Sequence, residues 1–454
     1  MQTIKTVLDQ QRSFFKTGKT RDIDFRKSQL KKLKQLIIDN EDLFFEAIHK
    51  DFGKSKFDTI TTELSIVYNE IDYYVKNLSK LSKPKRVRTN LANLPGKSRI
   101  HYEPLGCCLV IGAWNYPFQL SLAPVVAALA AGNCCVIKPS EVAENSMELL
   151  HELINSNFPT EYLHVEMGGV AETTEIVKHR YDKIFFTGSP RVGRIIYEAA
   201  AKHLTPVTLE LGGKSPAIVT ASANIDVAAK RIVWGKFLNA GQTCIAPDYI
   251  LVEESVSKQL IEHLKKHIMA FDYKPDSEHY TRIINDNHFE RLSRMIDQEK
   301  VVVGGKASLE NRYIEPTVLF PVDRTDAVME EEIFGPILPI LTFNKFDEAL
   351  EQIQQNEKPL SAYLFSTNSD EKNRFTQDIS FGGGCINDVV MHISNSNLPF
   401  GGVGNSGIGS YHGDFGFKAF SHQKSILYRK TWGEPNIKYP PYSKSKLKWI
   451  RKLI

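Results

Sequence analysis

The stretch that decides the fold is GCCLVIGAWNYPFQLSLAPVVAALAAGNCCVIKPS, Gly106 to Ser140. It opens with an apolar run of strand length, continues with a longer apolar segment of helical length that ends at Gly132, and closes with a second apolar run. Parallel strands need a crossover connection between them, and a helix is the usual one. The stretch therefore predicts a βαβ unit and an α/β protein. Its longest apolar run, Leu122 to Ile137, is too short to span a bilayer and is interrupted by Pro124 and by Gly132 and Asn133.

The same alternation extends over most of the chain. Residues 1–80 have helical apolar spacing, and the polar, basic stretch 82–98 predicts a loop or an extended connection. Two series of strands alternating with helices follow, which predicts two doubly wound α/β units with a cleft between them and ligands at the carboxyl ends of the strands. The expected strands are 106–114, 133–140, 162–169, 181–189 and 205–213 in the first series, and 249–254, 301–305, 337–343 and 361–366 in the second.

Composition excludes several classes of protein. The chain has 454 residues, with 57 basic and 53 acidic side chains, and a net charge of +4 gives no reason to expect nucleic acid as a partner. Its six cysteines include two adjacent pairs, which fit neither a disulfide framework nor a C-x-x-C metal site, so no metal is expected. Reduced thiols and an N-terminus without a secretory pattern favour the cytoplasm.

Residues 437–454 form a basic C-terminal tail. After a Pro-Pro turn, Leu447, Ile450 and Ile454 share one face of a short helical pattern flanked by lysine and arginine. We expect this helix to dock on its own protein or on a dimer partner. Weak peripheral contact with an anionic membrane is the alternative, because so short a segment binds lipid weakly.

Two glycine patterns do not bind phosphate in the usual way. GVGNSG, Gly402 to Gly407, matches the dinucleotide fingerprint by letter, but no strand precedes it and no good helix start follows. GGKS, ending at Ser215, resembles a P-loop, but Thr208 stands where the first glycine belongs. FTGS is better placed, because Gly188 and Ser189 lie between a predicted strand and a helix whose N–H groups can hold a pyrophosphate.

Two further positions have a functional and a plain structural interpretation. Lys138 and Glu141, just after a strand, could bind ribose hydroxyls or a 2′-phosphate, or could simply be surface charges at a helix start. Cys244 in LNAGQTCIAPDYIL could be a nucleophile, although a free cysteine is more often apolar filler. A working thiol needs an oxyanion donor and a base, and Glu210 is a carboxyl at a strand end with glycines after it.

Seven motifs occur together and in one order: NYP, KPSE, FTGS, ELGGKSP, GQTC, EEIFGP and PFGGVGNSGIG. This arrangement resembles the aldehyde dehydrogenase superfamily over most of the chain. The short N-terminus and the late KYPPY make it similar to the class 3 branch, which includes the fatty aldehyde dehydrogenases. Because of this resemblance, Cys244 is expected to be a functional thiol and not simply a small apolar residue of the core.

The resemblance implies three catalytic roles. Cys244 would be the nucleophile, and Glu210 the general base that activates water. Asn115 would donate its side-chain amide to the oxyanion, together with the Cys244 backbone N–H.

The resemblance also implies an NAD site without the usual glycine fingerprint. Six residues would hold the cofactor, on the adenosine ribose, the pyrophosphate and the nicotinamide ribose and ring. Lys138 and Glu141 would contact the adenosine ribose, and Gly188 and Ser189 the pyrophosphate. Glu332 and Phe334 would contact the nicotinamide ribose and ring. NAD is expected first, because the Glu141 charge repels a 2′-phosphate, with NADP possible because Lys138 could attract one.

The family fold implies a division of the chain and a dimer. An aldehyde dehydrogenase-like chain would have an NAD(P)-binding domain at 1–85 and 105–211 and a catalytic domain at 212–400. A small β oligomerisation arm would use residues 86–104 and 422–436. We expect a homodimer of the class 3 kind.

The expected reaction is NAD(P)-dependent oxidation of an aldehyde to a carboxylic acid, through a cysteine thiohemiacetal and a thioester. A medium or long aliphatic aldehyde is expected first and an aromatic one second. Three alternatives remain open: a CoA-acylating dehydrogenase, which Glu210 argues against, a cofactor-free thiol esterase, and a non-catalytic protein that binds a lipid surface.

Overall fold

The computed structural model describes residues 3–275 and 277–453, and its first sheet has six strands. Their order is β17-β7-β6-β3-β4-β5, and every pair is parallel except β17 with β7. The strands are β3 (Cys107–Ile111), β4 (Cys134–Lys138), β5 (Leu163–Val165), β6 (Lys183–Thr187), β7 (Val207–Glu210) and β17 (Gly407–Ile408). The five strands predicted in the first series are all present, which confirms the parallel sheet.

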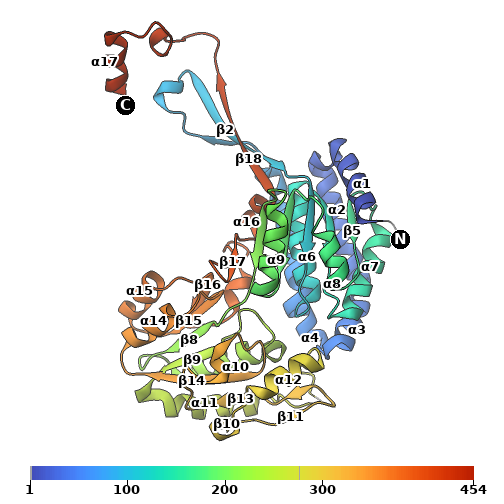
Figure 1. Ribbon diagram of the computed structural model, residues 1–454, viewed down its shortest axis with the longest axis vertical. Helices are drawn as coiled ribbons and strands as arrows, with labels where there is room; N and C mark the ends of the chain where they lie inside the picture. The colour runs from blue at the N-terminus through green and yellow to red at the C-terminus, as the bar shows by residue number, and fades with distance from the viewer. Residues whose placement is uncertain (1–2, 276, 454) are drawn as a thin grey trace.

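Helices of the first unit pack around this sheet (Figure 1). The crossover helices are α6 (Pro117–Ala131), α7 (Glu144–Asn157), α8 (Val170–Ile176) and α9 (Pro190–Ala201). The N-terminal segment supplies α1 (Ile4–Lys16), α2 (Ile23–Asp39), α3 (Glu41–Phe52), α4 (Lys56–Thr59), the π-helical turn η2 (Ile60–Leu64) and α5 (Ser65–Leu81).

Helix α6 shows why the deciding stretch folds as it does. Pro117 occupies its first turn, where a missing N–H costs nothing, and every residue of the helix is buried. The helix ends at Gly132, whose φ of 96° is open to glycine but strained for other residues. Chain reversal at Gly132 leads directly into β4, so the two strands lie side by side.

The second sheet has seven strands in the order β10-β13-β14-β9-β8-β15-β16, parallel except for β10 with β13. Its strands are β8 (Pro216–Val219), β9 (Tyr249–Glu253), β10 (Val301–Val303), β13 (Thr317–Leu319), β14 (Ile337–Phe343), β15 (Ser361–Phe365) and β16 (Gly383–Ile386). The prediction began this series at Tyr249 and was wrong by one strand. Strand β8 has only four residues and follows directly on the first sheet, so it has no separate apolar signal.

Helices and a small hairpin complete the second unit. They are α10 (Ile225–Phe237), η4 (Leu238–Gly241), α11 (Ser257–Ala270), α12 (Asp286–Arg294), the hairpin of β11 (Ala307–Ser308) and β12 (Tyr313–Ile314), α13 (Ala327–Glu330), α14 (Phe346–Gln354) and α15 (Ser369–Asp378). The chain then returns to the first sheet through β17 and continues into α16 (Gly413–Ala419).

A three-stranded sheet forms an arm that projects away from both units (Figure 1). Its order is β1-β2-β18, all antiparallel, with β1 (Lys85–Val87), β2 (Gly96–Pro104) and β18 (Ser421–Arg429). Two parts of the stretch predicted as a loop or an extended connection, 85–87 and 96–98, are therefore strand. Strand pairing ends at Arg429, before the limit of 436 that the resemblance implied.

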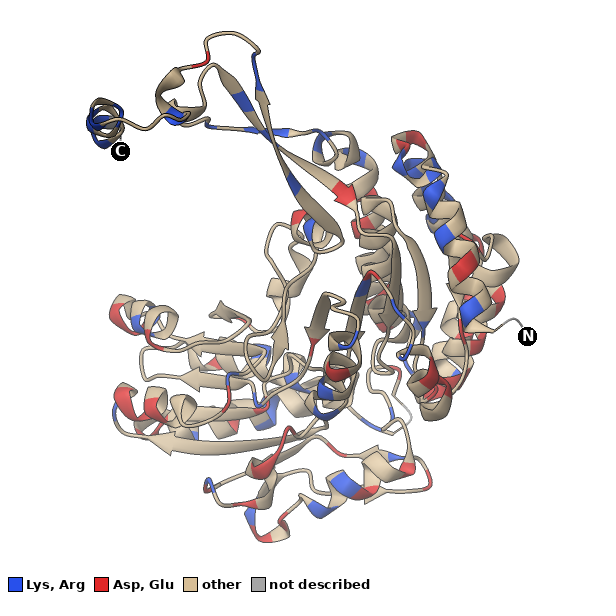
Figure 2. Cartoon of the chain, turned by 45° about the horizontal axis from the view of Figure 1, so that its top comes forward, with Lys and Arg blue, Asp and Glu red and all other residues tan. Residues whose placement is uncertain are grey.

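The far end of the arm carries a terminal helix, α17 (Lys444–Leu453), as predicted from the apolar spacing. It lies apart from the two units (Figure 1), and the blue segments in Figure 2 mark the basic residues along it. Leu447 is 50% and Trp449 62% exposed, so docking on the body of its own chain is excluded. Ile454 lies outside the described residues. No helix in 3–275 and 277–453 has the length and apolarity needed to cross a membrane.

Candidate active site

Cys244 lies in the loop between α10 and β9. The loop enters through three consecutive residues with positive φ: Asn239 at 54°, Ala240 at 51° and Gly241 at 74°. A Cβ on Gly241 would stand 2.2 Å from the carbonyl oxygen of Gly335, so only glycine fits between the two segments. This turn leaves Cys244 partly exposed, unlike the four buried cysteines of the first sheet.

Asn115 is bound to that same loop, although it follows β3 of the other sheet. Its Nδ2 donates to the Gln242 carbonyl at 3.1 Å, and Asn239 Nδ2 donates to the Asn115 carbonyl at 3.0 Å. The next residue makes a second link, with 2.6 Å between Tyr116 Oη and Thr243 Oγ1. The amide of Asn115 is therefore fixed beside the residues that immediately precede the thiol.

Glu210 ends β7 and lies between two strands. Its backbone pairs with Thr187 of β6 on one side and with Gly407 of β17 on the other. The glycine-rich segment rejected as a dinucleotide fingerprint thus leads into a strand beside Glu210. The Glu210 carboxyl is buried, and neither of its oxygens has a hydrogen-bond partner among the described residues. Burial raises the pKa of this carboxyl well above its usual range.

The environment of the thiol brings three predicted residues together. Burial raises the pKa of Cys244, and the nearby negative charges of Glu332 and then Glu210 raise it further. The backbone N–H groups of Cys244 and Ile245 act in the opposite direction and lower the pKa. Because charges act on a pKa mainly over short distances, both carboxyls lie in the neighbourhood of the sulfur.

Glu332 and Phe334 reach this space from the loop between α13 and β14. Glu332 lies against the backbone of the first unit, since a Cβ on Gly212 would overlap its carboxylate. Burial raises the pKa of Glu332 to about 8. The Phe334 ring packs edge-on against Trp114, with 5.3 Å between centroids.

The residues that hold this loop were not predicted from the sequence. Lys214 Nζ lies 2.6 Å from Asp248 Oδ2 and also donates to the Glu331 carbonyl at 2.8 Å. Asp248 accepts from the Ile333 N–H at 2.9 Å, and Arg291 donates to the Ile333 carbonyl at 2.6 Å. A lysine inside ELGGKSP is a visible signal, but the carboxylate and the arginine follow no sequence pattern.

Lys138 and Glu141 lie together at the carboxyl end of β4. The Lys138 side chain is 1% exposed, its Nζ donates to the Pro139 carbonyl at 2.6 Å, and it lies 3.6 Å from Glu141 Oε2. Burial lowers the pKa of Lys138, and the Glu141 charge opposes that shift. Since the Glu141 side chain is 39% exposed, a buried cation and an accessible carboxylate share one sheet edge.

Gly188 and Ser189 connect β6 to α9. The Gly188 N–H donates to the Glu210 carbonyl at 3.0 Å, and Ser189 caps the helix by accepting from the Val192 N–H at 3.4 Å. A Cβ on Gly193, in the first turn, would stand 2.7 Å from a methyl carbon of Leu211, so glycine permits close packing of α9. The predicted helix start is present, with its hydroxyl at the N-terminal end.

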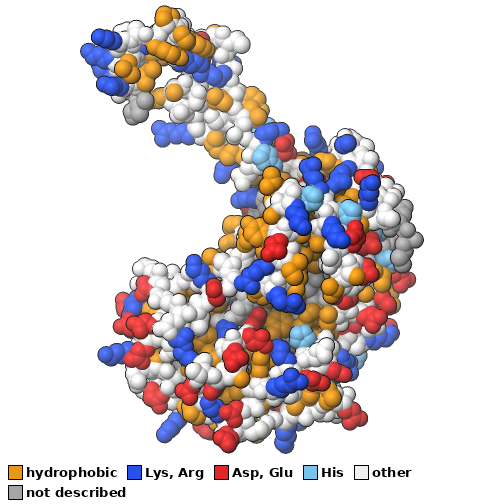
Figure 3. Space-filling model, viewed as in Figure 1, with side chains coloured by type: hydrophobic (Ala, Val, Ile, Leu, Met, Phe, Trp, Pro, Cys, Tyr) orange, Lys and Arg blue, Asp and Glu red, His pale blue; other side chains and the backbone are white. Residues whose placement is uncertain are grey.

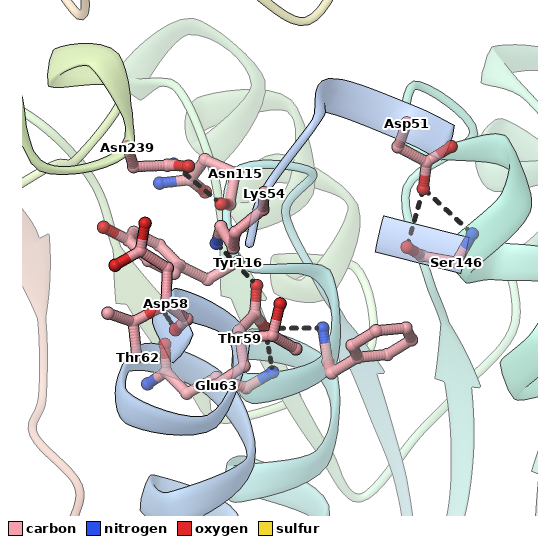
Figure 4. A network of polar contacts seen from close by, with 12 residues as sticks. Asp51, Lys54, Asp58, Thr59, Thr62, Glu63, Asn115, Tyr116, Ser146 and Asn239 are labelled. Atoms are coloured by element: carbon pink, nitrogen blue, oxygen red, sulfur yellow. Dashed lines mark hydrogen bonds and ion pairs between the residues drawn. The ribbon is translucent and has the colours of Figure 1, made fainter. Parts of the chain in front are cut away.

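A buried ion pair, also not predicted from the sequence, lies against Tyr116 and the start of α6 (Figure 4). Lys54 Nζ and Glu63 Oε1 are 2.9 Å apart, with both side chains at most 1% exposed. Glu63 Oε2 accepts from the N–H groups of Phe118 at 3.0 Å and Gln119 at 2.9 Å, at the start of α6. Lys54 Nζ also lies 4.2 Å from the centre of the Tyr116 ring.

Comparisons with known proteins identify the arrangement. The model of the aldehyde dehydrogenase family matches residues 2–426. The chain belongs to the aldehyde dehydrogenase family.

Relatives and a solved structure agree with this assignment. The chain is 48% identical to 4,4′-diaponeurosporen-aldehyde dehydrogenase of Staphylococcus aureus, over 97% of this chain and 96% of that one. It is 46% identical to the dimeric NADP-preferring aldehyde dehydrogenase of mouse, over 97% and 98%, and 44% identical to mouse aldehyde dehydrogenase family 3 member A2, over 97% and 92%. The substrate-bound structure of Staphylococcus aureus AldH has 47% identity and a TM-score of 0.97, covering 100% of this chain and 99% of that one.

This aldehyde dehydrogenase, of the class 3 kind, is an oxidoreductase that converts aldehydes to carboxylic acids with NAD(P). The chemistry of its residues fits that cofactor. A buried ammonium and an accessible carboxylate at the end of β4 suit a ribose, and a helix N-terminus follows β6 at the same edge of the sheet. Across from them, the Glu332 carboxyl and the Phe334 ring enter from the second unit.

Proposed function

We propose that Cys244, Asn115 and Glu210 carry the reaction of this aldehyde dehydrogenase, in the roles expected from the sequence. The observation that supports this most strongly is the charge environment of the thiol. Glu210 and Glu332 both act on Cys244, although they come from β7 and from the loop before β14. A cysteine sulfur with a carboxyl that has no partner among the described residues and an amide donor nearby can perform acyl chemistry.

In the first step the Cys244 sulfur bonds to the aldehyde carbon, and the carbonyl oxygen becomes an oxyanion. Asn115 Nδ2 carries a second N–H besides the one given to Gln242, and this donor together with the Cys244 backbone N–H holds the oxyanion. Such donors are worth most where water is excluded, because the charge is then poorly screened. When bound, NAD(P) supplies the hydride acceptor. Loss of the hydride from the former aldehyde carbon leaves a thioester on Cys244.

In the second step Glu210 takes a proton from water, and the hydroxide attacks the thioester carbon. The carbon–sulfur bond breaks, which releases the carboxylic acid and returns the thiolate. Burial raises the pKa of Glu210, so this carboxyl is a stronger base than an exposed glutamate. Because its oxygens have no partner among the described residues, they are available to a water molecule.

Glu210→Gln tests the hydrolytic role. We expect one rapid equivalent of NADH per active site followed by very slow turnover, because the thioester forms but is not hydrolysed. Stopped-flow absorbance with excess aldehyde and NAD measures both phases, and mass spectrometry of the quenched enzyme detects the acyl group on Cys244. Steady turnover close to the parent rate would remove Glu210 from this role.

Two rival activities are separated by product analysis. A CoA-acylating enzyme would give acyl-CoA when CoA is added, whereas the proposed mechanism gives free acid. A thiol esterase would hydrolyse p-nitrophenyl esters as its main reaction, without NAD. Ester hydrolysis accompanied by aldehyde-dependent NADH formation fits the proposal, since both reactions use Cys244.

The proposed substrates are medium- or long-chain aliphatic aldehydes, with aromatic aldehydes second. The 48% identity to a 4,4′-diaponeurosporen-aldehyde dehydrogenase supports a large apolar substrate. Steady-state kinetics with straight-chain aldehydes of increasing length, with benzaldehyde and with 4,4′-diaponeurosporen-aldehyde test this. A kcat/KM that falls with chain length, or that is highest for benzaldehyde, would contradict it.

The proposed coenzyme preference is NAD over NADP. The accessible carboxylate of Glu141 repels a 2′-phosphate, while the buried Lys138 ammonium beside it keeps NADP binding within reach. The same kinetics with both coenzymes decide the order. Glu141→Gln is expected to raise the NADP preference, and Glu144→Gln, on the first turn of α7, serves as its control.

We further propose a cytoplasmic homodimer assembled through the arm. The similarity to a dimeric mouse enzyme supports it, and so does the exposed apolar surface of β18, where Leu427 and Tyr428 are 42% and 46% exposed. Since α17 lies away from its own chain, a dimer partner is its proposed contact. Co-flotation of the enzyme with anionic phospholipid vesicles would assign the helix to a membrane surface instead.

A further inference from the structure

A cluster of two histidines and one aspartate lies where α10 and α11 pack against each other. Asp226 is in the first turn of α10, and His263 and His267 are four residues apart on one face of α11. Asp226 Oδ1 lies 2.8 Å from His263 Nδ1 and 3.0 Å from His267 Nε2. Three potential ligand atoms on two helices therefore converge on one point.

We infer that Asp226, His263 and His267 form a site for a divalent transition-metal ion, with zinc as the best fit. Two imidazole nitrogens and one carboxylate oxygen form a ligand set that zinc accepts. Ligand atoms about 2.0–2.2 Å from a tetrahedral zinc ion stand about 3.3 Å from one another. The separations of 2.8 and 3.0 Å from Asp226 Oδ1 to the two imidazole nitrogens need to open by only a few tenths of an ångström, and the two nitrogens lie within 4.8 Å of each other.

Burial and charge support this site. His267 is 7% exposed, so one ligand is fixed by packing, whereas Asp226 and His263 are partly exposed and leave an entry path from solvent. Asp226 Oδ1 lies within ion-pair distance of Lys266, His263 and His267, so its negative charge stands at the centre of the cluster. A fourth position can be filled by water, as in three-ligand zinc sites.

Lys266 is the competitor of the metal. Its Nζ lies 2.9 Å from the same Asp226 Oδ1, but its side chain is 61% exposed and can turn into solvent. A metal ion would replace this single positive charge by two at the same oxygen. The sequence predicted no metal, because Asp226 lies far from the two histidines in the chain and follows no metal-binding pattern.

The site would join the start of α10 to α11. Helix α10 leads through η4 to Cys244, so the metal holds a helix that precedes the nucleophile without touching the reacting atoms. A ligand that binds the folded chain and not the unfolded one raises stability by mass action. A bound metal would therefore stabilise the packing of α10 against α11. This stabilisation is independent of the proposed catalytic roles.

Zinc titration of the Cys244→Ser protein tests the inference, because the substitution removes one of the two partly exposed thiols as a competing ligand. Isothermal calorimetry is expected to give one zinc ion per chain, and the melting temperature to rise by about a few degrees at saturation. In the same background His263→Ala is expected to weaken binding by at least about tenfold, the lower end of what loss of an outer-sphere partner costs. His422→Ala, an exposed histidine on β18, should leave binding unchanged.

Two further measurements separate a metal site from plain packing. Lys266→Met removes the competing charge, so it is expected to raise zinc affinity, which loss of a structural ion pair would not do. Cobalt bound in place of zinc is expected to show ligand-field bands without sulfur-to-cobalt charge transfer. A thiolate band, unchanged affinity in His263→Ala, or no binding at millimolar zinc would overturn the inference.

Discussion

The side-chain amide of Asn115 is held in place before any substrate arrives. The side-chain amide donates to the Gln242 carbonyl, and the backbone carbonyl of Asn115 accepts from Asn239 Nδ2, so Asn115 has little freedom at the position of the proposed oxyanion. Preorganised donors are effective because no reorganisation is needed during the reaction.

We therefore expect Asn115→Ala to lower kcat by about 10²–10³, the usual loss for one oxyanion donor. The aldehyde KM should change much less, because the oxyanion forms only after binding. Steady-state kinetics measure the effect, and a melting curve checks that the fold is retained. A loss of only a few-fold would leave the backbone N–H of Cys244 as the main donor.

The charge of Glu332 adds to the effect of burial on the ionisation of the Cys244 thiol. Its negative charge raises the pKa of Cys244, and burial raises the pKa of Glu332 itself to about 8. Below pH about 8 the Glu332 carboxyl is neutral and has no effect on the thiol. Above that pH its charge disfavours the thiolate.

Glu332→Gln is therefore expected to speed alkylation of Cys244 by iodoacetamide above pH about 8 and to leave the rate unchanged below it. Mass spectrometry of the modified peptide separates Cys244 from the other cysteines. Glu331→Gln is the matched control, because the Glu331 side chain is 58% exposed and pairs with Arg291. Equal rates for Glu332→Gln and the parent at all pH values would show that the carboxylate does not face the sulfur.

The π-helical turn η2 and the start of α6 are joined by the Lys54–Glu63 pair (Figure 4). Burial lowers the pKa of Lys54 and raises that of Glu63, and each charge partly restores the ionised form of the other. Removal of one member leaves the other buried without its partner, which costs far more than loss of a surface pair.

Lys54→Met is expected to destabilise the enzyme by about 3–5 kcal/mol, because Glu63 loses its buried counter-charge. It should also lower kcat, since Tyr116 and Asn115 lose their support. Lys56→Met, two residues away in an exposed pair with Asp42, should change neither. Urea unfolding and steady-state kinetics compare the two variants. Equal urea midpoints for Lys54→Met and Lys56→Met would show that the Lys54–Glu63 pair does not stabilise the fold.

The long buried strands could be predicted from sequence because each is an apolar run bounded by glycine, proline or polar residues. Strands β3, β4 and β14 are examples. Short elements could not be predicted in this way. Strand β8 has only four residues, and β17 is defined by its pairing with β7 rather than by its own residues.

The candidate site divides in the same way. Residues within the ordered motifs, such as Cys244 and Glu332, could be named from the sequence, and their roles remain predictions. Lys54, Glu63 and Asp248 could not, because a single charged residue carries no signal until folding buries it beside a partner. The contact between Asn115 and Gln242 joins the two units and exists only in the folded chain.

The whole molecule presents its arm to solvent, and Figure 3 shows apolar and basic side chains at its far end. Strand β18 lies at one edge of the arm sheet, and β16 lies at one edge of the second sheet. An edge strand can pair with a strand of another chain, so β18 of one subunit can pair with β16 of its partner.

Leu427→Asp, in the middle of the exposed part of β18, is therefore expected to shift the enzyme from dimer to monomer, since a buried charge would oppose the contact. Met269→Asp on α11 of the second unit, where Met269 is 72% exposed, serves as the control, which should remain dimeric. Sedimentation velocity distinguishes the two species. A Leu427→Asp dimer as stable as the parent would place the interface elsewhere.

The pairing of β2 with β18 has a consequence for how the chain emerges from the ribosome. Strand β2 ends at Pro104, and its neighbour begins at Ser421. At translation rates of 5–20 residues per second, β2 waits about 15–60 s for the partner that covers its outer edge. During that interval a nascent chain offers an open hydrogen-bonding edge, so release before completion yields a fragment prone to self-association.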